Sequence, residues 1–100
     1  MTQQITHDQI SALMQPCRQD LARLDVASLS VFGSVARAES RDDSDIDVLV
    51  GFNGSPTIDR YMDVKLLLER VTGRRIDLVT EGALRPELRS RIVQEAVRVA

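Results

Sequence analysis

The sequence predicts one α/β (α+β) domain in which a small mixed three-stranded sheet is flanked by helices. Three short apolar runs have the length and the β-branched content of strands, and three longer segments repeat apolar residues at helical spacing. Strands are expected at 28–32, 45–50 and 75–80, and helices at 6–24, 55–72 and from Pro86 onward. A chain of 100 residues has the usual length of a single domain, so one domain should span 1–100.

The first helix should begin at Thr6, which forms the S/T-x-x-E/Q pattern of a capping box with Gln9. Pro16 should kink or divide this helix, because proline lacks an N–H and clashes with the preceding turn. Cys17 falls on the apolar stripe and is expected to pack in the core. As the single cysteine, it excludes an internal disulfide and fits a reducing compartment.

The second and third helices have start and stop signals of their own. We expect Ser55 as the N-cap of the second helix, Pro56 as its first helical residue and Gly73 as its end. Because this helix connects the second and third strands, those strands should be parallel. The residues predicted to face inward are Ile58, Tyr61, Val64, Leu67, Leu68 and Val71 in the second helix and Leu88, Ile92 and Ala96 in the last.

Two aspartates open the middle strand. Asp45 and Asp47 are two residues apart, so their side chains project from the same face of the strand. The apolar run that follows requires burial, and two like charges beside it repel each other unless a cation lies between them. Carboxylate oxygens prefer a hard cation such as magnesium. A calcium loop is excluded, because Val48 and Gly54 stand where that loop needs glycine and glutamate.

Gly33 and Ser34 follow the first strand and precede a short helical segment expected at 35–39. Glycine lets a ligand approach the backbone closely, and free N–H groups at a helix start attract phosphate. Ser34 adds a hydroxyl donor, although it could serve only as an N-cap. A phosphate-binding turn next to a metal-binding pair indicates a nucleoside triphosphate carried on magnesium. The chain has no Walker-type motif, which excludes a P-loop hydrolase.

The spacing from Gly33-Ser34 through ten residues to Asp45-Ile46-Asp47 resembles the GS-x10-D-x-D signature of the nucleotidyltransferase superfamily that includes DNA polymerase beta. The wider string FGSVARAES…DSDIDVLV is similar to the minimal nucleotidyltransferases, which partner HEPN-domain proteins in prokaryotic toxin–antitoxin pairs. The resemblance covers most of the chain and implies a palm-like fold. Ala38 departs from the pattern, because such proteins often carry glycine there; if the position needs a positive φ, alanine strains the loop.

The resemblance implies an enzyme that transfers AMP from ATP, held with two magnesium ions, to a protein hydroxyl. The acceptor it implies is a tyrosine of a HEPN-type toxin RNase, which AMPylation would neutralise. Asp77, in the third strand, would join Asp45 and Asp47 as a catalytic metal ligand. Independently of the resemblance, Arg37 is a candidate to bind the nucleotide phosphates with the Gly-Ser turn.

Several of these assignments have structural alternatives. Asp77 could be an exposed strand residue paired with Arg74 or Arg75, and Arg37 could face the triphosphate or only solvate its helix. Asp42 and Asp43 are expected to be loop charges rather than ligands. At the level of function, the alternatives are nucleotidylation of a small molecule such as an antibiotic and a module that neutralises the toxin by contact alone.

The bulk composition narrows the function classes. The net charge of −2 and the three aromatic residues give no pattern for direct nucleic-acid binding. No apolar run approaches the length of a membrane span, and the polar N-terminus does not resemble a signal peptide. We therefore expect a cytoplasmic protein without a membrane or nucleic-acid partner. Because one small domain leaves no second domain to grip an acceptor, a protein partner and a hetero-oligomer are expected.

Overall fold

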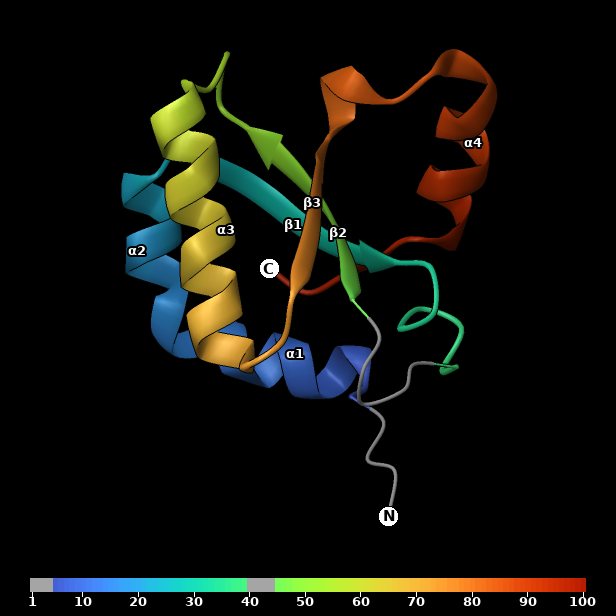
Figure 1. The fold of residues 1–100 in the computed structure, drawn as a ribbon, viewed down its shortest axis with the longest axis horizontal. Helices are drawn as coiled ribbons and strands as arrows, with labels where there is room; N and C mark the ends of the chain where they lie inside the picture. The colour runs from blue at the N-terminus through green and yellow to red at the C-terminus, as the bar shows by residue number, and fades with distance from the viewer. Residues whose placement is uncertain (1–4, 40–44) are drawn as a thin grey trace.

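The computed structural model describes residues 5–39 and 45–100 and confirms a mixed sheet flanked by helices (Figure 1). The expected loop at 40–44, with Asp42 and Asp43, lies outside these described ranges. The sheet has four strands rather than three, in the order β3-β2-β1-β4. Their bounds are β1 Val26–Phe32, β2 Ile46–Phe52, β3 Ile76–Thr80 and β4 Val97–Arg98.

The four strands do not all run in the same direction. β1 is antiparallel to β2 and to β4, whereas β2 and β3 are parallel, as the connecting helix predicts. β4 was not expected, because two residues are too short for a strand pattern. It is held to β1 by backbone bonds between Leu29 and the C-terminal residues, including one from the Val99 N–H at 2.9 Å.

The first predicted helix is divided into α1 His7–Met14, a 3₁₀ turn η1 Gln15–Cys17 and α2 Arg18–Arg23. Its capping box is confirmed, with reciprocal bonds between Thr6 and Gln9 at 3.2 and 2.9 Å. Pro16 lies in η1 and therefore divides the helix as predicted. Cys17 is buried in the core, also as predicted.

Helix α3 spans Ile58–Thr72, and its start differs from the prediction. Thr57, not Ser55, is the N-cap, because its hydroxyl accepts a bond from the Arg60 N–H at 3.1 Å. Ile58 is consequently the first helical residue and is 82% exposed rather than buried. Gly73 ends the helix in the left-handed conformation, with φ of 68°, as expected.

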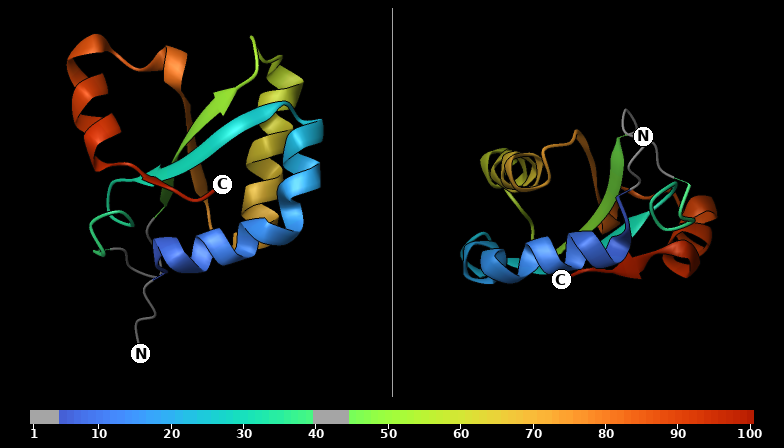
Figure 2. Two further views of the ribbon diagram at one scale, coloured as in Figure 1. Left: turned by 180° about the vertical axis from the view of Figure 1, so that it is seen from behind. Right: turned by 90° about the horizontal axis from the view of Figure 1, so that it is seen from below.

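The last helix, α4 Pro86–Glu95, follows the 3₁₀ turn η2 Glu81–Ala83 and begins with proline as predicted. No residue within α4 is fully buried. Leu88 was expected to face inward but is 45% exposed, because α4 stands apart from the rest of the molecule, on the side opposite α2 and α3 (Figures 1 and 2).

The core lies between the sheet and helices α1 to α3, and it is continuous. Within the described ranges, no helix is long and apolar enough to cross a membrane. The buried core residues are Ile10, Met14, Cys17, Leu21, Leu29, Val31, Val35, Ile46, Val48, Val50, Val64, Leu67, Leu68, Ile76, Leu78 and Val99.

Candidate active site

Two aspartates face each other across the parallel pair of strands. Asp47 on β2 and Asp77 on β3 are direct partners in the strand register, so their side chains project from one face of the sheet, one strand spacing apart. Asp47 is partly buried and Asp77 is exposed. In the described structure, no ion pair joins Asp77 to Arg74 or Arg75, so the alternative role as their partner is not realised.

The raised proton affinity of the Asp47 carboxyl shows that negative charges are crowded at the start of β2 and β3. Burial raises the pKa of its carboxyl to about 6, and Asp77 adds to the shift by charge and by hydrogen bonding. The charge of Asp45 raises the pKa further, whereas Arg37 lowers it. A carboxylate in this setting gains from any cation that binds beside it.

Asp45 lies immediately before β2 and is exposed. The sheet register therefore brings Asp47 and Asp77 directly together. The charge of Asp45 acts on Asp47 from the position just before β2. Among the described residues, no group of three or more His, Cys, Asp or Glu side chains is drawn together closely enough to hold a metal ion. The donor chemistry nevertheless fits magnesium, because it consists only of carboxylate oxygens whose repulsion a divalent cation would relieve.

Gly33 is in contact with this acidic pair. β1 and β2 pair Phe32 with Asp47, so the chain leaves β1 directly beside the Asp47 carboxylate. Gly33 has a φ of +67°, and a Cβ atom there would lie 2.2 Å from Asp47 Oδ2. Glycine is therefore required by backbone conformation and by space.

The segment after Gly33 is a single helical turn rather than the expected helix at 35–39. The Glu39 N–H bonds to the Ser34 carbonyl at 2.7 Å, and the Ala38 N–H bonds to the Val35 carbonyl at 3.1 Å. This pair of bonds is a Schellman motif, whose C′ residue adopts the left-handed conformation. Ala38 is that residue and has a φ of 58°, so the departure from glycine falls on a position that does need a positive φ.

The Ser34 side chain has no hydrogen-bond partner in the described part of the chain. It does not cap the turn, because the Arg37 N–H bonds to the Gly33 carbonyl at 3.1 Å. The hydroxyl is thus available to a ligand at the start of the turn, beside Asp47.

Arg37 is held by two carboxylates. Its Nε donates to Glu39 Oε2 at 3.2 Å, and its Nη1 donates to Glu95 Oε1 at 2.5 Å. The hydrogen bond to Glu39 raises the pKa of the guanidinium most, and the hydrogen bond to Glu95 raises it further. Arg37 is thus connected both to its own turn and to the end of α4. The sequence did not indicate Glu95, which lies 58 positions away and belongs to no motif.

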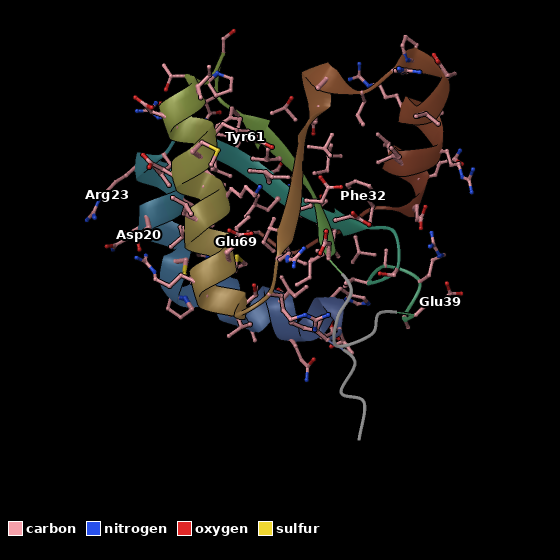
Figure 3. All side chains as sticks on the ribbon, viewed as in Figure 1. Asp20, Arg23, Phe32, Glu39, Tyr61 and Glu69 are labelled. Atoms are coloured by element: carbon pink, nitrogen blue, oxygen red, sulfur yellow. The ribbon has the colours of Figure 1, made fainter. Side chains whose placement is uncertain are left out.

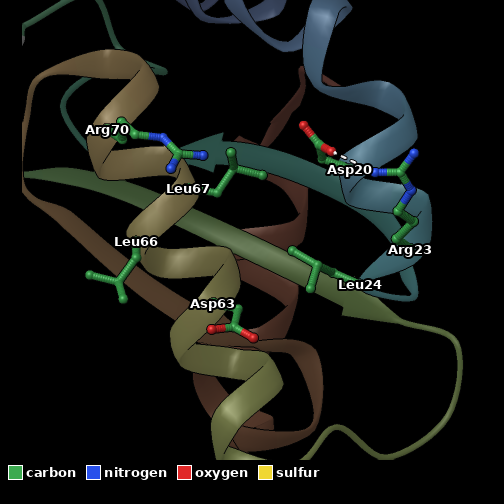
Figure 4. Close-up of a pocket in the computed structure, with 7 residues that line it drawn as sticks. All are labelled: Asp20, Arg23, Leu24, Asp63, Leu66, Leu67 and Arg70. Carbon is green, nitrogen blue, oxygen red and sulfur yellow. Dashed lines mark hydrogen bonds and ion pairs between the residues drawn. The ribbon is translucent and has the colours of Figure 1, made fainter.

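A groove of about 410 Å³ lies elsewhere, between α2 and α3 (Figure 4). Its walls carry charges of both signs, and Asp20 pairs with Arg23 at 3.4 Å. The residues lining this groove are Asp20, Arg23, Leu24, Asp63, Leu66, Leu67 and Arg70.

Comparison with known proteins decides the family. A model of the nucleotidyltransferase domain matches residues 14–99, which include every candidate site residue. The chain belongs to the nucleotidyltransferase family. It is 31% identical over 96 residues to the protein adenylyltransferase MntA of Thermococcus cleftensis, and the alignment covers 95% of this chain and 97% of that protein. The chain is accordingly a nucleotidyltransferase.

Solved structures share the fold of this nucleotidyltransferase. One, provisionally described as a minimal nucleotidyltransferase, is 38% identical with a TM-score of 0.80, covering 93% of this chain and 95% of that one. Another contains a tri-AMPylated HEPN toxin of Shewanella oneidensis in complex with an MNT antitoxin. It matches with a TM-score of 0.56 and 16% identity over 87% of this chain and 71% of that chain, which is a likeness of fold.

Proposed function

We propose that this nucleotidyltransferase is an antitoxin that transfers AMP from magnesium-bound ATP to a tyrosine hydroxyl of a HEPN-type toxin RNase. The observation that carries the proposal is the direct register of Asp47 and Asp77 beside the Gly33 turn. Two crowded carboxylates provide charge for a metal–nucleotide complex, and the turn provides room and donors for its phosphates.

The reaction joins the tyrosine oxygen to the α-phosphorus of ATP and breaks the bond from that phosphorus to the pyrophosphate, which leaves. Asp77 would take the proton that the tyrosine hydroxyl loses. Asp45, Asp47 and Asp77 would hold the magnesium, which supplies charge neutralisation and activation of the acceptor hydroxyl when bound. Ser34 donates to the phosphates, and Gly33 lets them approach the backbone. Positioning of the two reactants carries most of the rate enhancement.

The relatives support the choice of donor and acceptor. MntA of Thermococcus cleftensis is named a protein adenylyltransferase, which uses an adenylyl group and a protein acceptor. The Shewanella oneidensis complex pairs an MNT antitoxin with a toxin that carries AMP. The added AMP brings bulk and a phosphodiester charge, which would block an RNA-binding cleft on such a toxin.

The test is AMP transfer in a purified pair. The chain is incubated with its co-encoded HEPN-type protein, magnesium and α-labelled ATP, and the acceptor is mapped by mass spectrometry. We expect label on a tyrosine of the partner, with loss of its RNase activity. Transfer to a small-molecule hydroxyl instead, or neutralisation of the toxin without any label, would contradict the proposal.

A further inference from the structure

Arg37 bridges two acidic residues that lie far apart in the sequence. Glu39 belongs to the same turn, but Glu95 is the last residue of α4 and reaches the guanidinium at 2.5 Å. The Glu95 side chain is only 22% exposed, compared with 48% for Arg37. The carboxylate is thus the more buried partner, and its ion pair reduces the conformational freedom of the more exposed Arg37 side chain.

The backbone fixes Glu95 in this place. Two residues after it, β4 pairs with β1, matching Val97 with Val31 and Arg98 with Ser30. The Ala96 N–H also bonds to the Ile92 carbonyl and completes the helix end. The end of α4 is therefore fastened to the same strand that leads into the Gly33 turn.

Arg37 belongs to the turn that begins beside the acidic pair, because its N–H bonds to the Gly33 carbonyl at 3.1 Å and a Cβ atom at Gly33 would meet Asp47. The positive charge of Arg37 lowers the pKa of Asp47, in opposition to the neighbouring aspartates. Arginine has five N–H donors, and the contacts with Glu39 and Glu95 use one at Nε and one at Nη1. Within the described ranges no other residue accepts from the remaining donors, which can bind phosphate oxygens in the defined directions of a guanidinium.

We propose that Glu95 is a positioning residue of the nucleotide site, which orients Arg37 toward the β- and γ-phosphates of ATP. The proposal rests on the proposed function. In other phosphoryl-transfer sites, a glutamate on a separate helix orients a basic side chain at the phosphates in the same manner. Here the device would make the C-terminal end of α4 part of the site, although α4 contributes no fully buried residue to the core.

The experiment measures the dissociation constants of magnesium-ATP and of AMP by calorimetry in matched variants. Glu95→Gln keeps the size and the acceptor oxygen but removes the charge, and Glu87→Gln removes an exposed charge from the same helix as a control. We expect Glu95→Gln to weaken ATP binding about tenfold, the scale of one oriented charge-assisted hydrogen bond. AMP binding should stay within about twofold, because AMP lacks the β- and γ-phosphates.

A double-mutant cycle separates positioning from a general effect of charge or stability. In an Arg37→Ala background, Glu95→Gln should cause no further loss of ATP affinity. Unchanged or tighter ATP binding by Glu95→Gln, an equal loss for AMP, or an undiminished effect without Arg37 would each overturn the inference. If the wild-type chain transfers AMP but Glu95→Gln binds ATP normally, only this inference fails. If the wild type does not bind ATP, the inference and the proposed function both fail.

Discussion

The acidic edge formed by Asp45, Asp47 and Asp77 differs physically from the groove between α2 and α3. The groove is a hollow of about 410 Å³ lined by three leucines and by charges of both signs. At the acidic edge, by contrast, carboxylates of like charge lie near one another at the start of β2 and β3. The Gly33 backbone packs directly against the Asp47 carboxylate. Figure 3 places Glu39, on the turn after Gly33, on the opposite side of the molecule from Asp20 and Arg23 of the groove.

In this molecule, a hollow in the surface is by itself a weak indication of a functional site. In the groove, Asp20 and Arg23 neutralise each other, and such an exposed pair contributes little to stability. At the edge, the Asp47 carboxyl has a pKa of about 6 and no compensating ion pair in the described structure. Repulsion that the fold does not relieve is what a site for a cationic ligand requires.

The largest expected effect comes from removing two charges at the edge. Asp45→Asn with Asp47→Asn should reduce AMP transfer by a factor on the order of 10³ or more, because the metal and its nucleotide lose their ligands. The rise in melting temperature on adding magnesium-ATP should also disappear, since a ligand stabilises only the state that binds it.

The groove supplies the matched control. Asp20→Asn with Asp63→Asn removes two charges from the lining of the groove and should leave both transfer and the nucleotide-induced thermal shift intact. Loss of transfer in the groove variant, or a full thermal shift in the edge variant, would reverse the comparison.

Asp77→Asn should separate binding from chemistry. Asparagine keeps the size and one oxygen of the side chain but loses its charge and basicity. Under the proposed function Asp45 and Asp47 would still hold the nucleotide-bound metal, so affinity for magnesium-ATP should fall only modestly. Transfer should drop by a factor on the order of 10², as is typical for loss of a general base or a charge-stabilising group. Near wild-type transfer, followed with labelled ATP, would remove Asp77 from the site.

Two glycines with the same backbone conformation test the contact at the turn. Gly33 and Gly73 have φ values of +67° and +68°, but an added Cβ meets Asp47 Oδ2 only at Gly33 and has nothing within 4 Å at Gly73. Gly73→Ala should therefore cost about 1 kcal/mol of unfolding free energy, from backbone strain alone. Gly33→Ala should cost about 2–3 kcal/mol and should also weaken magnesium-ATP binding. Equal costs in urea denaturation would show that the Asp47 carboxylate moves away freely.

The raised pKa of Asp47 predicts a pH dependence of stability without metal. In the folded chain the pKa of its carboxyl is about 6, raised from the ordinary value of 3.8. Its protonation therefore stabilises the fold fully below pH 4, and this contribution is lost as the pH rises through 6. Because Asp47 is partly exposed, solvent screening reduces this contribution to the free energy of unfolding to about 1 kcal/mol. The stability difference between Asp47→Asn and wild type should grow in favour of the variant from pH 4 to 7; a constant difference would contradict the shift.

Most of the fold was predictable because it depends on local patterns. The capping box at Thr6, the break at Pro16, the end at Gly73 and the parallel pairing of β2 with β3 all follow from short signals. The wrong predictions have two causes. Two neighbouring residues competed for the same N-cap position, and a short C-terminal strand forms only through its tertiary pairing. Thr57 displaced Ser55 as N-cap, and the two-residue β4 is stabilised only by its pairing with β1.

The site divides in the same way. The parallel pairing of β2 with β3 brings Asp47 and Asp77 into direct register, whereas Asp45 lies one residue before β2 and acts on Asp47 through its charge. The contact between Arg37 and Glu95 could not be predicted, because it depends on how α4 returns to β1 and has no sequence pattern of its own. Pairings over such distances are fixed by tertiary structure, which a single sequence does not display.

The smallest expected effect concerns the turn itself. Ala38 occupies the left-handed C′ position of the Schellman motif, where a side chain is unfavourable and glycine is not. Ala38→Gly should relieve the strain but give the unfolded chain more freedom, for a net gain of about 0.5 kcal/mol in unfolding free energy. Gly54→Ala, at a φ of +93° with open space around its Cβ position, is the reverse change outside the site and should be destabilising. If Ala38→Gly instead lowers stability and raises the dissociation constant of magnesium-ATP, the alanine is what keeps the phosphate turn rigid, and the edge depends on its stiffness as well as its charge.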